Sequence, residues 1–144
     1  MDAPEMVSVL QGATDDGFAW VLRARFDAPD DLMTMLQVSR GDQWGEGGFG
    51  GPPLYDGERL NTWIGSRDGQ PTFLALRADP DVTAVDIADR TGQMWHLVLS
   101  EIDQRFALRF GVFRVPDGAE VVEVRPSDAP SGSGQRIRSP WRRG

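Results

Sequence analysis

FAWVLRARF, residues 18–26, is the stretch that decides the fold class. Its apolar side chains recur at every second position, as Phe18, Trp20, Leu22, Ala24 and Phe26. Successive side chains of a β-strand point to opposite faces of the sheet, so this period of two predicts a strand with one buried face. Turn-forming residues bound the stretch on both sides, with DDG at 15–17 and APDD at 28–31.

Similar short runs repeat along the chain, with turn residues between them. The segment 32–38 fits a strand best, although the acids at 30–31 could also open a short helix there. We find no amphipathic helix of ordinary length. The pattern therefore predicts an all-β fold, an antiparallel β-sandwich of eight or nine short strands. The remaining strands are expected at 5–10, 60–64, 72–77, 82–88, 93–99, 106–112 and 121–125.

Residues 39–59 break this regular pattern. They contain seven glycines and a Pro-Pro pair at 52–53, and they show no clear period. We therefore expect a loop of about twenty residues, which is longer than the roughly 12–15 residues beyond which a loop is usually functional or mobile. The glycines match no phosphate-binding motif, because no lysine follows them and the prolines block a helix start.

Three aromatic residues in this expected loop, Trp44, Phe49 and Tyr55, are the candidate binding residues of the domain. Aromatic rings on a mobile scaffold suit a protein partner, a sugar or a cationic ligand. The alternative is that they fold back as a lid over one end of the sandwich. The neighbouring acids Glu46, Asp56 and Glu58 leave a carboxylate-dependent hydrolase as a further hypothesis.

The composition changes after residue 125. We expect a β-sandwich domain over residues 1–125 and a flexible linker with a basic tail over residues 126–144. Subtracting the four arginines of residues 136–144 from the formal charge of −7 leaves −11 on residues 1–135. The tail could bind a protein partner or the acidic body of its own domain. Nucleic acid could bind only through the arginines of the tail, and the tail could also be an inert terminus. Its candidate residues are Arg136, Arg138, Trp141, Arg142 and Arg143.

Composition excludes several classes of function. The chain has no cysteine, which removes disulfides, thiolate metal sites and cysteine nucleophiles. All fifteen basic residues are arginine, so no lysine can form a Schiff base or a phosphate-loop contact. No stretch approaches the roughly 18 apolar residues of a transmembrane helix, and the acidic start is not a signal peptide. We expect a cytoplasmic protein as written, or a secreted or envelope-associated protein if a leader was removed.

The sequence contains no constellation that predicts catalysis. His96 is the single histidine, so it cannot build a histidine-rich metal site, and no nucleophile-elbow sequence supports a serine triad. Aspartates at 15–16, 30–31, 79, 81, 86 and 89 fit turn positions better than a calcium loop. We therefore expect no catalytic residue, no cofactor and no metal.

Four segments between residues 71 and 130 carry a family resemblance: TFL at 72–74, DPDVTAV at 79–85, FGVF at 110–113 and SD at 127–128. Together they resemble immunoglobulin-like β-sandwich domains of GC-rich actinobacterial proteins. The cysteine pair of antibody domains is missing. The resemblance implies a β-sandwich that is extracytoplasmic or binds a partner. The leading hypothesis is a non-enzymatic protein-interaction or accessory module; the alternative is a ligand- or carbohydrate-binding domain that uses the segment 40–59.

Overall fold

The computed structural model describes residues 5–66, 69–129 and 135–136, and it contains no helix in these ranges. The strands form three antiparallel sheets. The first sheet is a meander in sequence order, made of β1 (Val7–Ala13), β2 (Ala19–Ala28), β3 (Asp31–Arg40) and β4 (Gln43–Phe49). The second has the order β5 (Leu60–Gly65), β6 (Phe73–Ala78) and β9 (Arg109–Arg114). The third has the order β11 (Gln135–Arg136), β10 (Val121–Pro126), β7 (Ala84–Asp89) and β8 (Met94–Val98).

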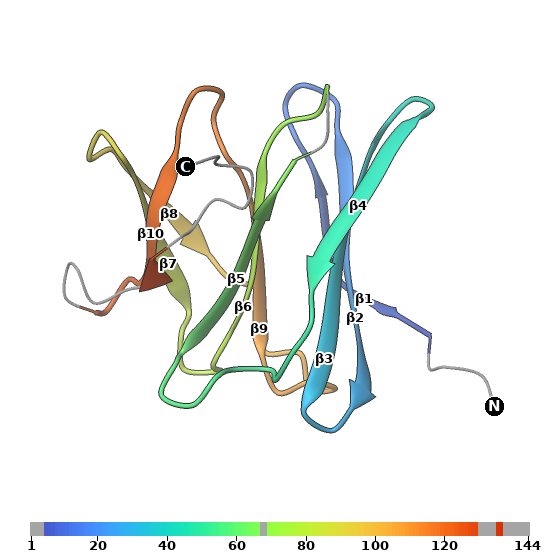
Figure 1. Cartoon of the computed structure of the whole chain (residues 1–144), viewed down its shortest axis with the longest axis vertical. Helices are drawn as coiled ribbons and strands as arrows, with labels where there is room; N and C mark the ends of the chain where they lie inside the picture. Colours follow the sequence, from blue (N-terminus) through green and yellow to red (C-terminus); the bar gives the residue numbers. More distant parts are fainter. Residues whose placement is uncertain (1–4, 67–68, 130–134, 137–144) are drawn as a thin grey trace.

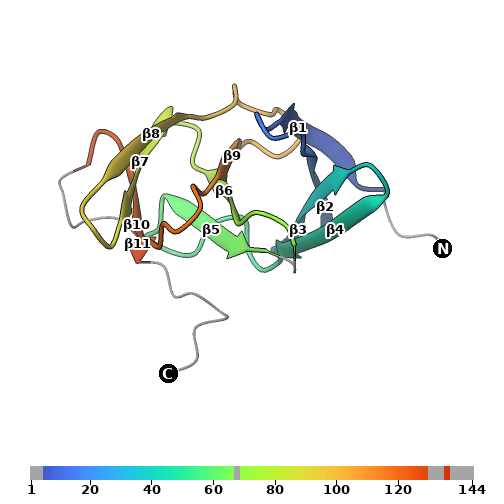
Figure 2. The ribbon, with the colours of Figure 1, turned by 90° about the horizontal axis from the view of Figure 1, so that it is seen from above.

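The sheets stack as three layers, with the β5–β6–β9 sheet in the middle (Figures 1 and 2). The meander covers one face of the middle sheet, and the β11–β10–β7–β8 sheet covers the other. The expected all-β sandwich is confirmed. Residues 32–38 are a strand, because they lie within β3, where alternate side chains are buried against the middle sheet.

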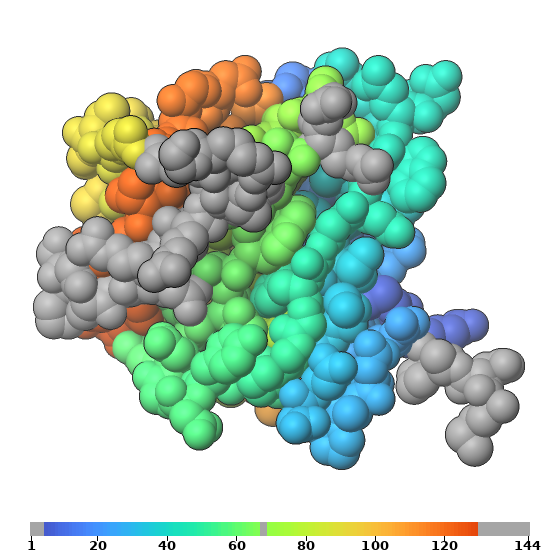
Figure 3. All heavy atoms as spheres, in the orientation of Figure 1, coloured from blue at the N-terminus to red at the C-terminus, as the bar shows by residue number. Residues whose placement is uncertain are grey.

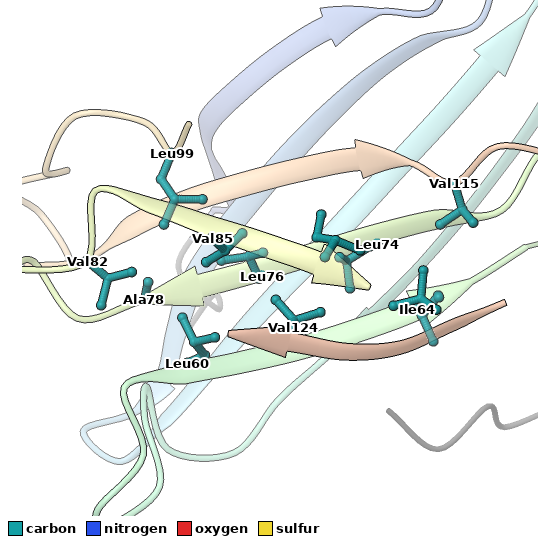
Figure 4. Close-up of a cluster of buried hydrophobic side chains, with 12 residues drawn as sticks. Leu60, Ile64, Leu74, Leu76, Ala78, Val82, Val85, Leu99, Val115 and Val124 are labelled. Carbon is teal, nitrogen blue, oxygen red and sulfur yellow. The ribbon is translucent and has the colours of Figure 1, made fainter. Parts of the chain in front are cut away.

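β6 is the strand that both outer sheets enclose, and all six of its residues are buried. Phe73 and Ala75 pack into the core beneath the meander. Leu74, Leu76 and Ala78 point the other way, into the core beneath the third sheet, which Figure 4 shows in close-up. A strand that is covered on both faces needs apolar residues at successive positions, which explains the run FLAL at 73–76.

Arg77 is the exception in this strand, because it is charged and has no exposed surface. It lies on the meander side of β6, and the Phe49 ring packs against its guanidinium at 4.4 Å. Burial lowers the pKa of Arg77 to about 10, so the side chain stays charged at neutral pH. Its donors are satisfied by the Thr34 hydroxyl (2.7 Å) and by the carbonyls of Leu32 (2.8 Å), Gly50, Pro52 and Pro53 (each 2.9 Å).

The expectation of a twenty-residue loop over 39–59 is wrong for residues 43–49, which form β4. The RGD tripeptide at 40–42 lies at the turn of the β3–β4 hairpin. Glycines normally weaken a strand, but here neighbouring atoms leave no room for side chains. A Cβ on Gly47 would lie 2.6 Å from the Trp63 indole, and one on Gly48 would lie 2.1 Å from the Thr34 carbonyl oxygen. The irregular segment is therefore limited to residues 50–59.

The chain continues past β10 with further contacts to the sandwich. The Ser127 N–H donates to the carbonyl of Ala84 (3.0 Å), and Asp128 pairs with Arg59 (3.2 Å). The two residues of β11 pair with Glu123 and Val124 of β10. Residues 130–134 and 137–144 of the expected linker and tail lie outside the described residues.

Arg77→Lys tests the role of the buried guanidinium. Lysine keeps the charge but cannot reach several carbonyls at once, so buried acceptors lose their donors. We expect the free energy of unfolding to fall by about 3 kcal/mol or more, measured by chemical denaturation. The matched control is Arg23→Lys on the exposed face of β2, which should change stability by no more than about 0.5 kcal/mol. Equal losses in the two variants would contradict this role of Arg77.

Candidate functional site

A small apolar cavity lies where the meander and the middle sheet meet, between β4 and β5. Its volume is about 90 Å³. Leu36 and Val38 of β3 line one side, Trp63 of β5 and Phe73 of β6 line the other, and Pro71 completes the apolar wall. Figure 3 shows the face of the molecule on which β4 and β5 run. The cavity has room for about one branched aliphatic side chain, well below the roughly 300 Å³ at which small-molecule pockets begin.

Trp63 and two glycines give the cavity its shape. The indole lies against Gly47 of β4 and against Gly65 of its own strand, where an added Cβ would come within 2.6 Å and 2.3 Å of the ring. Gly45 and Gly47 occupy the inward face of β4, so that face offers backbone in place of side chains. The cavity therefore exists because Gly45 and Gly47 have no side chains that could fill the space beside the indole.

β4 is an outer strand of the meander, and its outward backbone groups lie beside the cavity. Gly41, with φ of 61°, is the first of two turn residues between Arg40 and Gln43, as in a type II′ turn. The residues that flank such a turn exchange backbone hydrogen bonds, and the exchange then recurs at every second pair. It follows that Trp44, Glu46 and Gly48 point their N–H and C=O groups away from β3.

The polar groups around the cavity are few. Glu46 contributes the single formal charge among the described lining residues, and Ser66 and Gln70 add neutral polar groups. Glu46 is exposed and lies on the outer strand of a chain whose net charge is −7. The rim of the cavity therefore favours a cation over an anion.

The structure separates the three aromatic residues that the sequence grouped together. Trp44 lies on the outer face of β4 and is 60% exposed, whereas Phe49 at the other end of the strand turns inward beneath Arg77. Five residues of strand place these two positions roughly 17 Å apart. Tyr55 lies beyond them in the irregular segment and is 52% exposed. The three rings do not form one platform, and the aromatic residues that line the cavity are Trp63 and Phe73.

The other predicted site residues fall into two groups. Arg136 is in β11, opposite Glu123 of β10. Arg138, Trp141, Arg142 and Arg143 lie outside the described residues. Glu46, Asp56 and Glu58 are all exposed, and of these three only Glu46 lines the cavity. The geometry gives no support to a carboxylate pair that faces a substrate in a cleft.

His96 has an acid and a hydroxyl as neighbours, which invites comparison with a serine triad. Its Nδ1 lies 2.9 Å from Asp86 Oδ1 and 3.2 Å from Ser127 Oγ, and the Ser127 hydroxyl also reaches Asp86 at 3.0 Å. A working triad places the acid and the serine on opposite ring nitrogens. Here both meet the same nitrogen, so the imidazole is not placed to take a proton from the serine while the acid supports it.

A second, wider hollow lies between the β1–β2 turn and β9, with a volume of about 530 Å³. Its cation, Arg114, is already paired with Asp16 at 2.8 Å and Asp117 at 3.6 Å. The hydrogen bond from Thr14 lowers the pKa of Asp16, and Arg114 adds to the shift. The positive charge of the hollow is therefore already compensated, and its remaining formal charge is the carboxylate of Asp15.

The described part of the chain has neither a metal-binding cluster nor a membrane-spanning helix. No three His, Cys, Asp or Glu side chains in it gather closely enough to hold a metal ion. In the same residues, no helix has the length and apolar character needed to cross a membrane.

Asp86→Asn tests the electrostatic role of the His96 cluster. The hydrogen bond from His96 holds the pKa of Asp86 below its ordinary value, and Ser127 adds to the shift. Asp86 thus contributes stability above its unfolded pKa of about 4, and that contribution is lost as the pH falls through the lower folded pKa. We expect Asp86→Asn to flatten the loss of stability between about pH 5 and pH 2, measured by denaturation at each pH.

The control for this experiment is Asp42→Asn at the exposed tip of the β3–β4 hairpin. It should leave the acid side of the stability profile close to that of the unsubstituted protein. An Asp86→Asn profile that parallels the unsubstituted protein throughout would contradict the assignment.

Comparison with known proteins gives no match: no family model, no curated protein and no solved structure is similar to this chain. A function can therefore be argued only from the geometry of the chain itself. The cavity beside Trp63 and the outer strand β4 are the features from which that argument starts.

Proposed function

We propose that this protein is a non-enzymatic interaction module that binds an extended segment of a partner protein along β4. The observation that carries the proposal is the cavity of about 90 Å³ beside the outward backbone of that strand. An added strand would bond to the backbone of Trp44, Glu46 and Gly48. Main-chain bonds supply affinity in such pairing, and pockets for alternate side chains supply specificity.

The size of the cavity favours a peptide side chain over a free small molecule. Side chains of the added strand that face the same way as Gly45 and Gly47 would point toward Trp63. One aliphatic side chain fills the space, and burying it contributes about 1.5–3 kcal/mol. A sugar would need an accessible ring face with several polar groups beside it, and the Trp63 indole is packed against Gly47 and Gly65.

Charge narrows the class of partner further. Glu46 lies at the cavity, and residues 1–135 carry −11. A segment with arginine or lysine next to the aliphatic residue is attracted by this surface, whereas an acidic segment is repelled. The resemblance of residues 71–130 to immunoglobulin-like domains implies a sandwich that is extracytoplasmic or binds a partner, and the second of these agrees with the proposed role.

The test uses labelled seven-residue peptides of the form Arg-Thr-Thr-X-Thr-Thr-Arg, with X as glycine, valine, leucine or glutamate. We expect the leucine or valine peptide to bind about tenfold or more tightly than the glycine peptide, because its side chain enters the cavity. Fluorescence anisotropy of the labelled peptide gives the affinity. Glu46→Arg should weaken binding, and the matched control Glu58→Arg, an exposed acid outside the cavity, should not.

A peptide N-methylated at alternate residues separates strand addition from simple filling of the cavity. It keeps the side chains but cannot donate to the backbone of β4, so it should bind much more weakly. The proposal would be overturned if the glycine and leucine peptides bound equally well. It would also be overturned if the N-methylated peptide bound as tightly as the unmethylated peptide of the same sequence. A response to monosaccharides in the absence of any peptide response would favour the carbohydrate-binding alternative.

A further inference from the structure

A different outer strand, β8, has the sequence MWHLV, with no acid and no arginine among its own side chains. Two charged side chains of the neighbouring strands reach it, because Arg125 of β10 contacts Met94 at 4.0 Å and Asp86 of β7 contacts His96 at 2.9 Å. Met94 and Val98 are 46% and 71% exposed, and they flank His96 on the outer face of the third sheet. Figure 2 shows β8 at the edge of its layer, on the side away from β10. An uncharged outer strand with high β-propensity is suited to pair with another strand.

The hydrogen bonds to β7 determine which backbone groups of β8 face outward. The Asp89 N–H donates to the Gln93 carbonyl at 3.0 Å, and the Leu99 N–H donates to the Thr83 carbonyl at 2.9 Å. In an antiparallel pair such bonds recur at every second residue. Trp95 and Leu97 therefore bond to β7, and Met94, His96 and Val98 direct their N–H and C=O groups away from the sheet.

We propose that β8 binds β8 of a second copy of this chain in antiparallel pairing, with a two-fold axis at His96. This register pairs the outward groups of each strand and forms six backbone hydrogen bonds. It also places Met94 of one copy across from Val98 of the other, so the exposed apolar side chains cover each other. The third sheets of the two copies then form one continuous sheet.

Self-pairing is favoured over a foreign partner by symmetry and charge. The sequence 94–98 has apolar residues at equal distances on either side of His96, so the surface is complementary to itself. Each copy carries −7, so close approach is opposed almost anywhere else on the surface, but β8 contributes no acid to the contact. Each His96 is also held by its own Asp86 at 2.9 Å, which compensates any positive charge at the axis.

Single cysteines test the register, since the natural chain has none. At His96→Cys the two Cα atoms would be about 5.5 Å apart across the axis, within the range of a disulfide. Met94→Cys and Val98→Cys would each lie about 13 Å from their own copy, too far for a bond. Under mild oxidation we expect most of the His96→Cys protein to become a covalent dimer. The Met94→Cys and Val98→Cys proteins should each stay mainly monomeric.

Mixing the Met94→Cys and Val98→Cys proteins should produce a crosslinked pair, because these positions face each other. In sedimentation of the unsubstituted protein, the apparent mass should rise with concentration from 15.9 kDa toward twice that value. This measurement does not depend on how any variant folds. Trp44→Cys on β4 is the matched control and should not crosslink. A monomer at 100 µM, or equal crosslinking at all four positions, would overturn the proposal.

Discussion

The buried guanidinium of Arg77 is the interaction on which the meander side of the molecule depends. It stands in the middle sheet, yet its hydrogen bonds go to β3 and to the carbonyls of residues 50–53. Among the described contacts no carboxylate forms an ion pair with it; backbone carbonyls and the Thr34 hydroxyl accept its hydrogen bonds instead. A desolvated charge is tolerated only when its donors are satisfied, so the chain after β4 must follow a path that brings its carbonyls to this point.

That path determines where β4 ends and therefore where the cavity lies. Phe49 packs on the guanidinium and closes the core at one end of β4, while Gly45 and Gly47 leave the core open nearer the hairpin. The Trp63 indole fills part of the space that side chains would otherwise occupy. β4 is thus packed into the core at Phe49, whereas beside Trp63 a cavity lies next to its unpaired edge. A surface that binds an added strand needs such an unpaired edge with a pocket beside it.

The sequence predicted the parts of the fold that depend on alternation. β3 shows one buried residue in two, Leu22 and Ala24 of β2 are buried in the same period, and the period of both strands was readable without the structure. β4 was missed because glycine carries no apolar signal, although its glycines at 45 and 47 alternate with Trp44 and Glu46 in the period of a strand. Arg77 was counted as an ordinary strand residue, since a charged side chain at a buried position can be recognised only once its acceptors, 24 to 45 residues away in sequence, are placed.

The candidate site was predictable only in part, for a related reason. The sequence drew attention to residues 40–59, and Glu46, Gly45 and Gly47 of that segment do line the cavity. Its main aromatic, Trp63, lies in β5, and no local pattern connects it to Gly47. The structure separates Trp44 and Phe49 because they lie on opposite faces and at opposite ends of β4, and it places Tyr55 in the irregular segment 50–59.

The outer strands β4 and β8 differ in charge, and this difference favours a different partner for each. The chain has no lysine, the residue that most often protects the edge of a sheet, so each edge depends on other residues. β4 carries Glu46, and two copies paired there would bring acids together in a molecule that is already strongly negative. β8 carries no acid and is symmetric about His96, so a second copy meets no repulsion from the strand itself. Charge therefore favours the two proposals, a foreign basic segment at β4 and a second copy at β8, and the two strands belong to different sheets.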